Sequence, residues 1–190
     1  MRARKGQRWY SEEMQFATRL FILATIAVPA TLGPIARADA PAEEKRLRLY
    51  HTHTRERIDV VYWRDNMYVP DGLAQLDRFL RDSITGDVHR YDPHLFDVLF
   101  ELTRASGRPG AEIQVICGYR SPQTNEFLRT HTSGVAKQSL HMEAEAIDIR
   151  LLGVKTSSLR DAALALGRGG VGYYPASDFI HVDVGRVRRW

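Results

Sequence analysis

Residues 145–151 have the sequence Glu-Ala-Ile-Asp-Ile-Arg-Leu, and residues 179–184 have the sequence Phe-Ile-His-Val-Asp-Val. In both segments an apolar side chain occupies every second position, and side chains alternate between the two faces of a strand. Both segments are therefore predicted to be strands with one buried apolar face. If these apolar faces pack on the same helices, Asp148 and His181 emerge together on the opposite face of the sheet.

A third polar residue lies within reach of that face. His141 precedes Asp148 by seven residues, which is a short loop. Two imidazoles and one carboxylate are a common set of protein ligands for a catalytic zinc ion, with water in the fourth position. Spacing alone leaves the alternative open that these histidines are surface or hydrogen-bonded residues.

The remainder of the chain predicts an α+β domain. Helical spacing of apolar residues and the N-cap signals at Asp92-Pro93, Ser121-Pro122 and Ser158–Asp161 indicate four helices. Helices come early and strands cluster late, which favours a mainly antiparallel sheet with the helices packed on one face. The expected helices span 72–82, 92–107, 121–130 and 158–167, and the expected strands span 46–54, 58–63, 112–117, 143–152, 170–174 and 179–184.

The first forty residues are predicted to be a secretory signal peptide. Basic residues precede the uncharged run at 20–36, and the small-residue tripeptide Ala38-Asp39-Ala40 follows it. The run is shorter than the roughly 20 apolar residues that span a bilayer, and it contains prolines. An uncleaved anchor is the alternative, and Met14 is an alternative start. Residues 41–46 are expected to form a polar tether, and residues 47–190 a single domain.

Charge and cysteine content exclude several classes of function. The chain of 190 residues has a formal charge of +4, but its leader contains six basic and three acidic residues. Residues 41–190 then carry 21 basic and 20 acidic residues, and this near-neutral balance disfavours nucleic-acid binding. The single cysteine, Cys117, cannot form an intramolecular disulfide, and its place in a predicted strand indicates a small buried apolar residue.

Several blocks of the sequence resemble one superfamily of zinc peptidases. Ser139-Leu-His141-Met-Glu-Ala144-Glu-Ala146-Ile-Asp148 resembles the Ser-x-His-x-x-Gly-x-Ala-x-Asp motif of the D-Ala-D-Ala carboxypeptidase/VanX superfamily. Phe179–Asp183 resembles its second histidine block, and Gly118–Pro122 its Gly-Tyr-Arg-Ser block. Residues 134–137 and 169–175 are similar to the YcbK/MepK-like branch of murein endopeptidases. The resemblance covers nearly all of residues 46–190.

The resemblance implies a hedgehog/D-Ala-D-Ala carboxypeptidase-like fold with one Zn²⁺ in the domain. It implies His141, Asp148 and His181 as the zinc ligands. It also implies that Arg120 steadies the substrate carbonyl or the developing oxyanion. Ser139 is expected to orient a ligand from outside the ligand set.

Two points depart from the superfamily pattern or stay open. Ala144 stands where the superfamily has glycine, at a position where the backbone is expected to require a positive φ. The superfamily's acidic base usually lies three residues before the second histidine, and Asp178 occupies that position. Asp183 is the competing candidate because it faces the same way as His181.

The implied function is hydrolysis of peptide cross-links in peptidoglycan between diaminopimelate residues, by a monomeric, exported, periplasmic enzyme. Membrane contact is expected only transiently or through an uncleaved leader. The alternatives are a carboxypeptidase that removes a terminal D-amino acid and a non-catalytic, zinc-stabilised module that binds peptidoglycan. The basic run of Arg186, Arg188 and Arg189 is expected to be a solvated face, with Trp190 docking it. Tyr119, Tyr173 and Tyr174 are expected to be core or rim aromatics rather than catalytic groups, and the alternative is that one of them lines the substrate groove.

Overall fold

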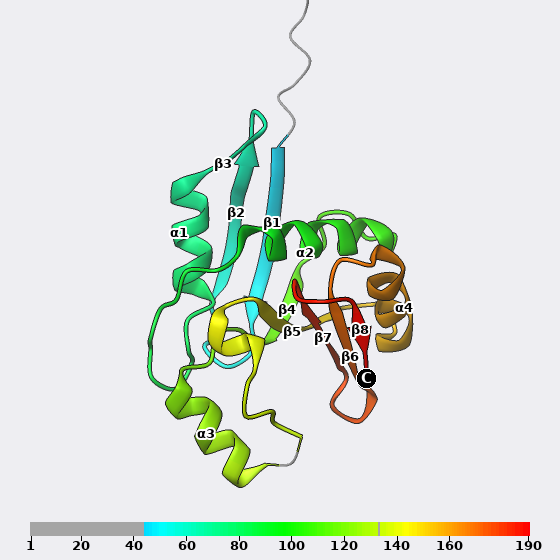
Figure 1. Cartoon of the computed structure of the whole chain (residues 1–190). Helices are drawn as coiled ribbons and strands as arrows, with labels where there is room; N and C mark the ends of the chain where they lie inside the picture. The colour runs from blue at the N-terminus through cyan, green and yellow to red at the C-terminus, as the bar shows by residue number, and fades with distance from the viewer. Residues whose placement is uncertain (1–43, 133) are drawn as a thin grey trace, which may run out of the picture. The chain divides into compact units, whose positions relative to one another are not determined.

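A single mixed sheet organises the part of the chain that the computed structural model describes, which is residues 44–132 and 134–190. Its strand order is β3-β2-β1-β4-β5-β7-β6-β8 (Figure 1). All neighbouring strands are antiparallel except for the parallel pairs β1–β4 and β6–β8. The strands are β1 (Glu44–His51), β2 (Arg57–Arg64), β3 (Met67–Tyr68), β4 (Ile113–Cys117), β5 (Ala146–Leu151), β6 (Gly170–Tyr174), β7 (Phe179–Asp183) and β8 (Arg188–Arg189).

Three of the four α-helices cover one face of this sheet. α1 packs on β2, α2 on β1 and α4, and α4 on β5, β6 and β7. α3 stands apart (Figure 1), and the residues it buries, Thr124 and Asn125, are polar. The helices are α1 (Pro70–Phe79), α2 (Pro93–Ala105), α3 (Pro122–His131) and α4 (Thr156–Leu166), with the short 3₁₀ segments η1 (Leu140–Glu143) and η2 (Pro175–Ser177).

The core forms where the apolar faces of the strands meet α1, α2 and α4. Ile147 and Ile149 of β5 and Ile180 and Val182 of β7 are almost fully buried there. Burial of such a side chain contributes on the order of 1.5–3 kcal/mol, so these four positions fix the faces of both strands. The predicted α+β class and the mainly antiparallel sheet are confirmed.

Some boundaries differ from the sequence-based expectations. Residues 44–46 of the expected tether belong to β1, and residues 41–43 lie outside the described part of the chain. The capping box expected at Ser158–Asp161 is wrong, because α4 begins two residues earlier at Thr156 and Lys155 caps it without a side-chain hydrogen bond. The start of the strand expected at 143 is replaced by η1 and a turn.

The predicted leader, residues 1–40, lies outside the described residues. Within 44–132 and 134–190, no helix has the length and apolar character required to cross a bilayer.

Candidate metal centre

Asp148 and His181 meet because β5 and β7 are paired in a defined register. The two residues are directly opposite each other in this antiparallel pair, next to the pair formed by Ile147 and Val182. Since Ile147 and Val182 point into the core, Asp148 and His181 point to the other face of the sheet. The structure thus brings together the two side chains that the strand pattern predicts on one surface.

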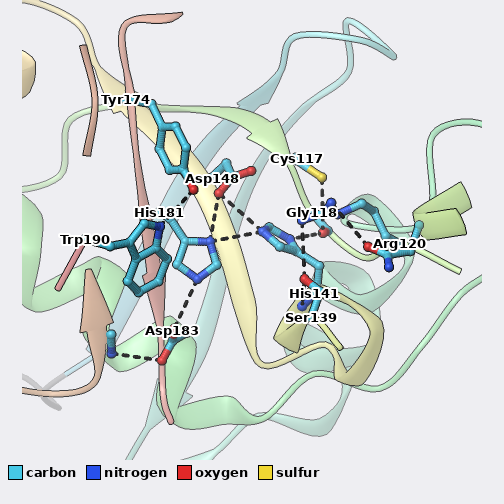
Figure 2. A network of polar contacts seen from close by, with 12 residues as sticks. Cys117, Gly118, Arg120, Ser139, His141, Asp148, Tyr174, His181, Asp183 and Trp190 are labelled. Atoms are coloured by element: carbon cyan, nitrogen blue, oxygen red, sulfur yellow. Dashed lines mark hydrogen bonds and ion pairs between the residues drawn. The ribbon is translucent and has the colours of Figure 1, made fainter. Parts of the chain in front are cut away.

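His141 reaches the same point from η1. The Ser139 Oγ accepts a hydrogen bond from the His141 backbone N–H at 3.4 Å and so caps this short segment. The His141 carbonyl accepts from the Arg120 N–H at 3.1 Å, and His141 Nδ1 lies 2.8 Å from the Gly118 carbonyl oxygen. The imidazole is therefore fixed at both its backbone and its far ring nitrogen, and its Nε2 faces the two strand residues (Figure 2).

Three ligand atoms form a small triangle. His141 Nε2 is 3.1 Å from His181 Nδ1 and 3.2 Å from Asp148 Oδ1, and His181 Nδ1 is 2.9 Å from Asp148 Oδ1. The remaining ring nitrogens face oxygens that only accept: the Gly118 carbonyl for His141 and the Asp183 carboxylate for His181. In the neutral imidazoles these outer nitrogens carry the hydrogens, so both inner nitrogens present lone pairs.

Electrostatics favour a cation at the triangle. Burial lowers the pKa of His141 and keeps it neutral. Burial also disfavours charge on His181, but hydrogen bonds with Asp148 and Asp183 outweigh burial and raise its pKa. Burial disfavours ionised Asp148 as well, yet the two imidazoles hold the pKa of its carboxyl well below the usual range. Asp148 contributes one carboxylate charge, and a bound cation would replace the proton that His181 Nδ1 shares with Asp148, which would leave two inward-facing lone pairs.

The dimensions of the triangle fit a tetrahedral metal ion. Zinc lies about 2.0–2.1 Å from nitrogen and oxygen ligands, so two ligand atoms at tetrahedral angles are roughly 3.3 Å apart. The observed separations of 2.9–3.2 Å are close to that edge length. The residues present would therefore fit a divalent cation with three protein ligands, all of which line one cavity.

Cys117 lies beside this centre, but its sulfur is not part of the triangle. Its residue is paired with Asp148 across β4 and β5, where an irregular register between Val115 and Cys117 bends β4. The sulfur is within 4.8 Å of ligand atoms of His141 and Asp148. Burial raises the pKa of the thiol to about 12, and the thiol contacts the Gly118 carbonyl at 3.6 Å. His181 Nδ1 lies only 3.1 and 2.9 Å from the other two atoms of the triangle, so His181 completes it better than Cys117.

Asp183 is surrounded by hydrogen-bond donors. Its side chain is 0 % exposed, and Oδ1 accepts from Gly170 N at 2.8 Å, Gly185 N at 2.9 Å and Arg188 Nη1 at 3.1 Å. Oδ2 accepts from Arg188 Nη2 at 2.7 Å and His181 Nε2 at 3.1 Å. Burial disfavours this charge, but the five donors outweigh burial and hold the pKa of the carboxyl well below the usual range. This arrangement suits a residue that orients His181 better than one that collects a proton.

Asp178 has the opposite surroundings. It lies between η2 and β7 with φ +52°, and its side chain is 64 % exposed. Its carboxylate contacts the Thr156 hydroxyl and, at 3.5 Å, the Arg150 guanidinium. Its neighbours Ser177 and Phe179 line the cavity at the metal centre, whereas Asp178 itself faces Arg150 in this conformation.

Arg120 and Ser139 form one wall of that cavity. The guanidinium is 3.4 Å from both the Ser139 hydroxyl and the Asn125 side-chain oxygen. Its buried Nε has no hydrogen-bond partner among the described residues. The cavity has a volume of about 510 Å³ and holds His141, Asp148 and His181 at its base. A cation at this wall is available to a bound carbonyl or carboxylate.

Comparison with known proteins adds the family. A family model described as peptidoglycan L,D-endopeptidase MepK matches residues 39–190. The chain belongs to the MepK peptidase family. A relative from Haemophilus influenzae named "Probable peptidoglycan L,D-endopeptidase MepK" is 43% identical over 144 residues, which cover 76% of this chain and 77% of the relative. The MepK of Escherichia coli K12, named a peptidoglycan L,D-endopeptidase, is 38% identical over 175 residues, covering 90% and 95%. No solved structure matches the chain.

The departure at Ala144 coincides with a special backbone conformation. Ala144 ends η1 in the left-handed region, with φ 53° and ψ 37°, and is fully buried. A residue with a Cβ is strained by roughly 1–2 kcal/mol there, whereas glycine is not. The sequence-based concern that this position requires positive φ is therefore confirmed, and this chain accepts the strain.

Sequence analysis missed how Arg188 and Trp190 contribute to the centre. The expectation of a solvated basic face is wrong for Arg188, which forms an ion pair with the buried Asp183 at 2.7 Å. The Trp190 indole lies against the His181 imidazole, with ring centroids 5.2 Å apart. Trp190 and Tyr174 also line the cavity. The similarity of residues 185–190 to the murein endopeptidase branch indicated that this segment matters, but the spacing of its residues did not predict their contacts with Asp183 and His181.

Proposed function

We propose that this chain is an exported, zinc-dependent endopeptidase that hydrolyses peptide cross-links of peptidoglycan between two diaminopimelate residues. Membership of the MepK family makes the chain a peptidoglycan endopeptidase. The convergence of two imidazole lone pairs and one carboxylate at the base of a cavity carries the proposal to a metal mechanism. The L,D designation of the relatives supports a bond that joins an L-centre to a D-centre, as in a cross-link between two diaminopimelate residues.

His141, Asp148 and His181 would hold the zinc ion. A bound zinc ion would polarise the substrate carbonyl and lower the pKa of a bound water to about 7. Two neutral imidazoles and one carboxylate leave a net charge of about +1 on such a site, which preserves its Lewis acidity. The hydrogen bonds of the outer ring nitrogens with Gly118 and Asp183 favour the neutral tautomers with hydrogen on those outer nitrogens, so metal binding would have to displace a proton only from His181 Nδ1.

Arg120, Ser139 and Asp183 would stabilise charge and orient other groups. Arg120 would offset negative charge on the substrate carbonyl oxygen as the tetrahedral intermediate forms, because it borders the same cavity. Ser139 would orient both Arg120 and His141, since it contacts each of them. Asp183 would orient His181.

Asp178 is the better candidate for the proton acceptor. Its oxygens are exposed, and the Arg150 contact at 3.5 Å is long. A side-chain rotation at the cavity rim would give up only this exposed ion pair, which contributes at most about 1 kcal/mol, and the exposed hydrogen bond from the Thr156 hydroxyl. Asp183 would have to give up five buried hydrogen bonds to accept a proton.

Purified protein and defined cross-linked muropeptide dimers test the function. Zinc-loaded protein is expected to convert the dimer into two monomers. Mass spectrometry identifies this hydrolysis because the masses of the two monomers sum to the mass of the dimer plus one water. Loss of a single D-amino acid without monomer formation would indicate a carboxypeptidase, and binding without any product would indicate a non-catalytic module.

Two histidine variants test the metal centre. His141→Ala is expected to abolish monomer release and to lower the bound zinc measured by mass spectrometry. The matched control is His94→Ala, because the His94 side chain is 74% exposed and lies outside the cavity. Monomer release by His141→Ala at the wild-type rate would refute the metal mechanism.

A further inference from the structure

We propose that Tyr174 is a catalytic residue that donates a hydrogen bond to the oxyanion of the tetrahedral intermediate, and that Trp190 is the positioning residue that aims its hydroxyl. The inference rests on the proposed endopeptidase function and assigns a second stabilising group to it. Tyr174 and Trp190 line the cavity together with the three proposed zinc ligands. Figure 2 shows them on the His181 side of the centre, whereas Arg120 lies on the His141 side.

The direction of the Tyr174 hydroxyl hydrogen follows from its partner. Trp190 Nε1 lies 2.9 Å from the Tyr174 oxygen. An indole N–H can only donate, so the phenol oxygen accepts this bond and its own hydrogen points elsewhere. Among the described residues the structure provides no acceptor for that hydrogen. The Tyr174 hydroxyl points toward the centre in Figure 2, so a substrate oxygen would find an unused donor there.

The Tyr174 ring is held in one orientation. It stacks on Phe179 with a centroid separation of 4.6 Å and an interplanar angle of 18°. Tyr174 and Phe179 are a directly opposed pair of β6 and β7, so the stacking is fixed by the register of the sheet. A donor that does not have to be reoriented during the reaction is the kind that stabilises a transition state most.

Contacts of both its backbone and its ring hold Trp190 in place. Its backbone continues the pairing with β6 through Trp190 N to Val171 O at 3.2 Å and Tyr173 N to Trp190 O at 3.1 Å. The indole lies so close to Gly172 that a Cβ there would come within 2.8 Å of it. The Arg188 guanidinium lies over the indole at 4.9 Å. Although Trp190 is 51% exposed, these contacts keep its indole between His181 and the Tyr174 hydroxyl.

The same segment reaches His181 along a second path. Arg188 forms an ion pair with Asp183, and Asp183 accepts from His181 Nε2. Residues 188–190 thus contact both a proposed zinc ligand and the proposed oxyanion donor. A purely packing role for Trp190 would need its ring, but it would not need its N–H group.

Tyr174→Phe removes only the hydroxyl and keeps the stacked ring. We expect kcat for dimer hydrolysis to fall by about 10²–10³-fold, the usual effect of losing one oxyanion donor, with KM changed by less than about threefold. Zinc affinity, measured by competition with a chromophoric chelator, is expected to stay within twofold. A phosphinate analogue of the dimer, which mimics the tetrahedral geometry, is expected to lose affinity by the same factor as kcat.

Trp190→Phe tests the positioning role because it removes the N–H donor and keeps an aromatic ring. We expect kcat to fall by about tenfold, since the Tyr174 hydroxyl is then free to rotate away. Tyr173→Phe is the matched control: it changes the neighbouring tyrosine of β6, whose ring packs under Arg160 and outside the cavity. It is expected to change kcat by less than twofold.

Three results would overturn the inference. The first is a Tyr174→Phe variant with kcat within threefold of wild type. The second is a parallel fall of kcat and zinc affinity, which indicates a structural role, and the third is a raised KM with unchanged kcat, which indicates ground-state binding only. If the wild-type protein itself releases no monomers, the proposed function fails, and that outcome is separate from all three.

Discussion

Asparagine in place of Asp183 removes one negative charge and changes the shape of the side chain very little. In the native protein the carboxylate accepts from two backbone N–H groups, from both terminal nitrogens of Arg188 and from His181 Nε2. If the asparagine oxygen takes the place of Oδ1, its NH₂ group faces the Arg188 Nη2 and His181 Nε2 donors. At least two donors, the buried His181 Nε2 and the partly buried, charged Arg188 Nη2, then lose their acceptor.

The expected magnitude follows from these two lost acceptors. An unsatisfied buried donor costs about 1–3 kcal/mol, and more when it is charged. Breaking a buried ion pair by changing one partner costs about 3–5 kcal/mol. We therefore expect the free energy of unfolding to fall by about 3–5 kcal/mol. The asparagine N–H₂ group also favours the His181 tautomer with hydrogen on Nδ1, so zinc affinity is expected to fall by about 10–100-fold.

Urea unfolding followed by circular dichroism measures the first quantity, and chelator competition measures the second. Asp178→Asn is the matched control, because Asp178 directly precedes β7, the strand that Asp183 ends, but is exposed. Its effect on unfolding is expected to stay below about 1 kcal/mol.

Two outcomes would refute this reasoning. A loss of less than about 1 kcal/mol for Asp183→Asn would mean that the five contacts do not stabilise the fold as the geometry implies. Unchanged stability and zinc affinity with a kcat reduced by about 10²-fold would make Asp183 the proton acceptor, in place of Asp178.

Three further predictions concern other parts of the fold. Burial lowers the pKa of His51, which is 1% exposed, to about 4. Because the unfolded chain binds this proton below about pH 6.5, the free energy of unfolding should fall by up to about 3 kcal/mol as the pH falls from 6.5 to 4. Above pH 6.5 the contribution of His51 should stay constant, and His51→Gln should flatten the slope in urea titrations. Ala144→Gly should change the unfolding free energy by less than about 1 kcal/mol, because relief of left-handed strain is offset by a freer unfolded chain and a lost buried methyl group; a larger change in either direction contradicts the balance. Gly172→Ala should displace the Trp190 indole and alter tryptophan fluorescence, while a spectrum identical to wild type would show that the contact is looser than 2.8 Å implies.

Alternation of apolar residues was enough to predict β5 and β7, and with them the common face of Asp148 and His181. The prediction succeeded because a shift of one residue would have placed Ile147 and Val182 in water. The spacing of His141 placed it within loop reach of that face, and the resemblance made it an expected ligand, but nothing in the spacing specifies that η1 directs its ring back over β5.

The environments of the two candidate bases could not be derived from the sequence. Asp178 and Asp183 are the same residue type, so the sequence does not distinguish them. Only tertiary contacts give Asp183 five hydrogen-bond donors and leave Asp178 exposed. The Arg188 contact depends on the short parallel pair β6–β8, and a two-residue strand leaves no periodic pattern. Long-range pairing of this kind depends on the whole fold rather than on local sequence.

The three proposed zinc ligands come from η1, β5 and β7, which are separated along the chain by up to forty residues. A bound ion would therefore fasten three segments in a protein whose one cysteine excludes an internal disulfide. Backbone pairing holds β5 to β7 without it, whereas η1 is attached mainly through His141, Ser139 and Arg120. Metal depletion should then loosen the loop around η1 first, and amide hydrogens there should exchange faster while those of β5 and β7 stay protected. Metal supply in the cell envelope would in that way set the lifetime of the folded enzyme as well as its rate of turnover.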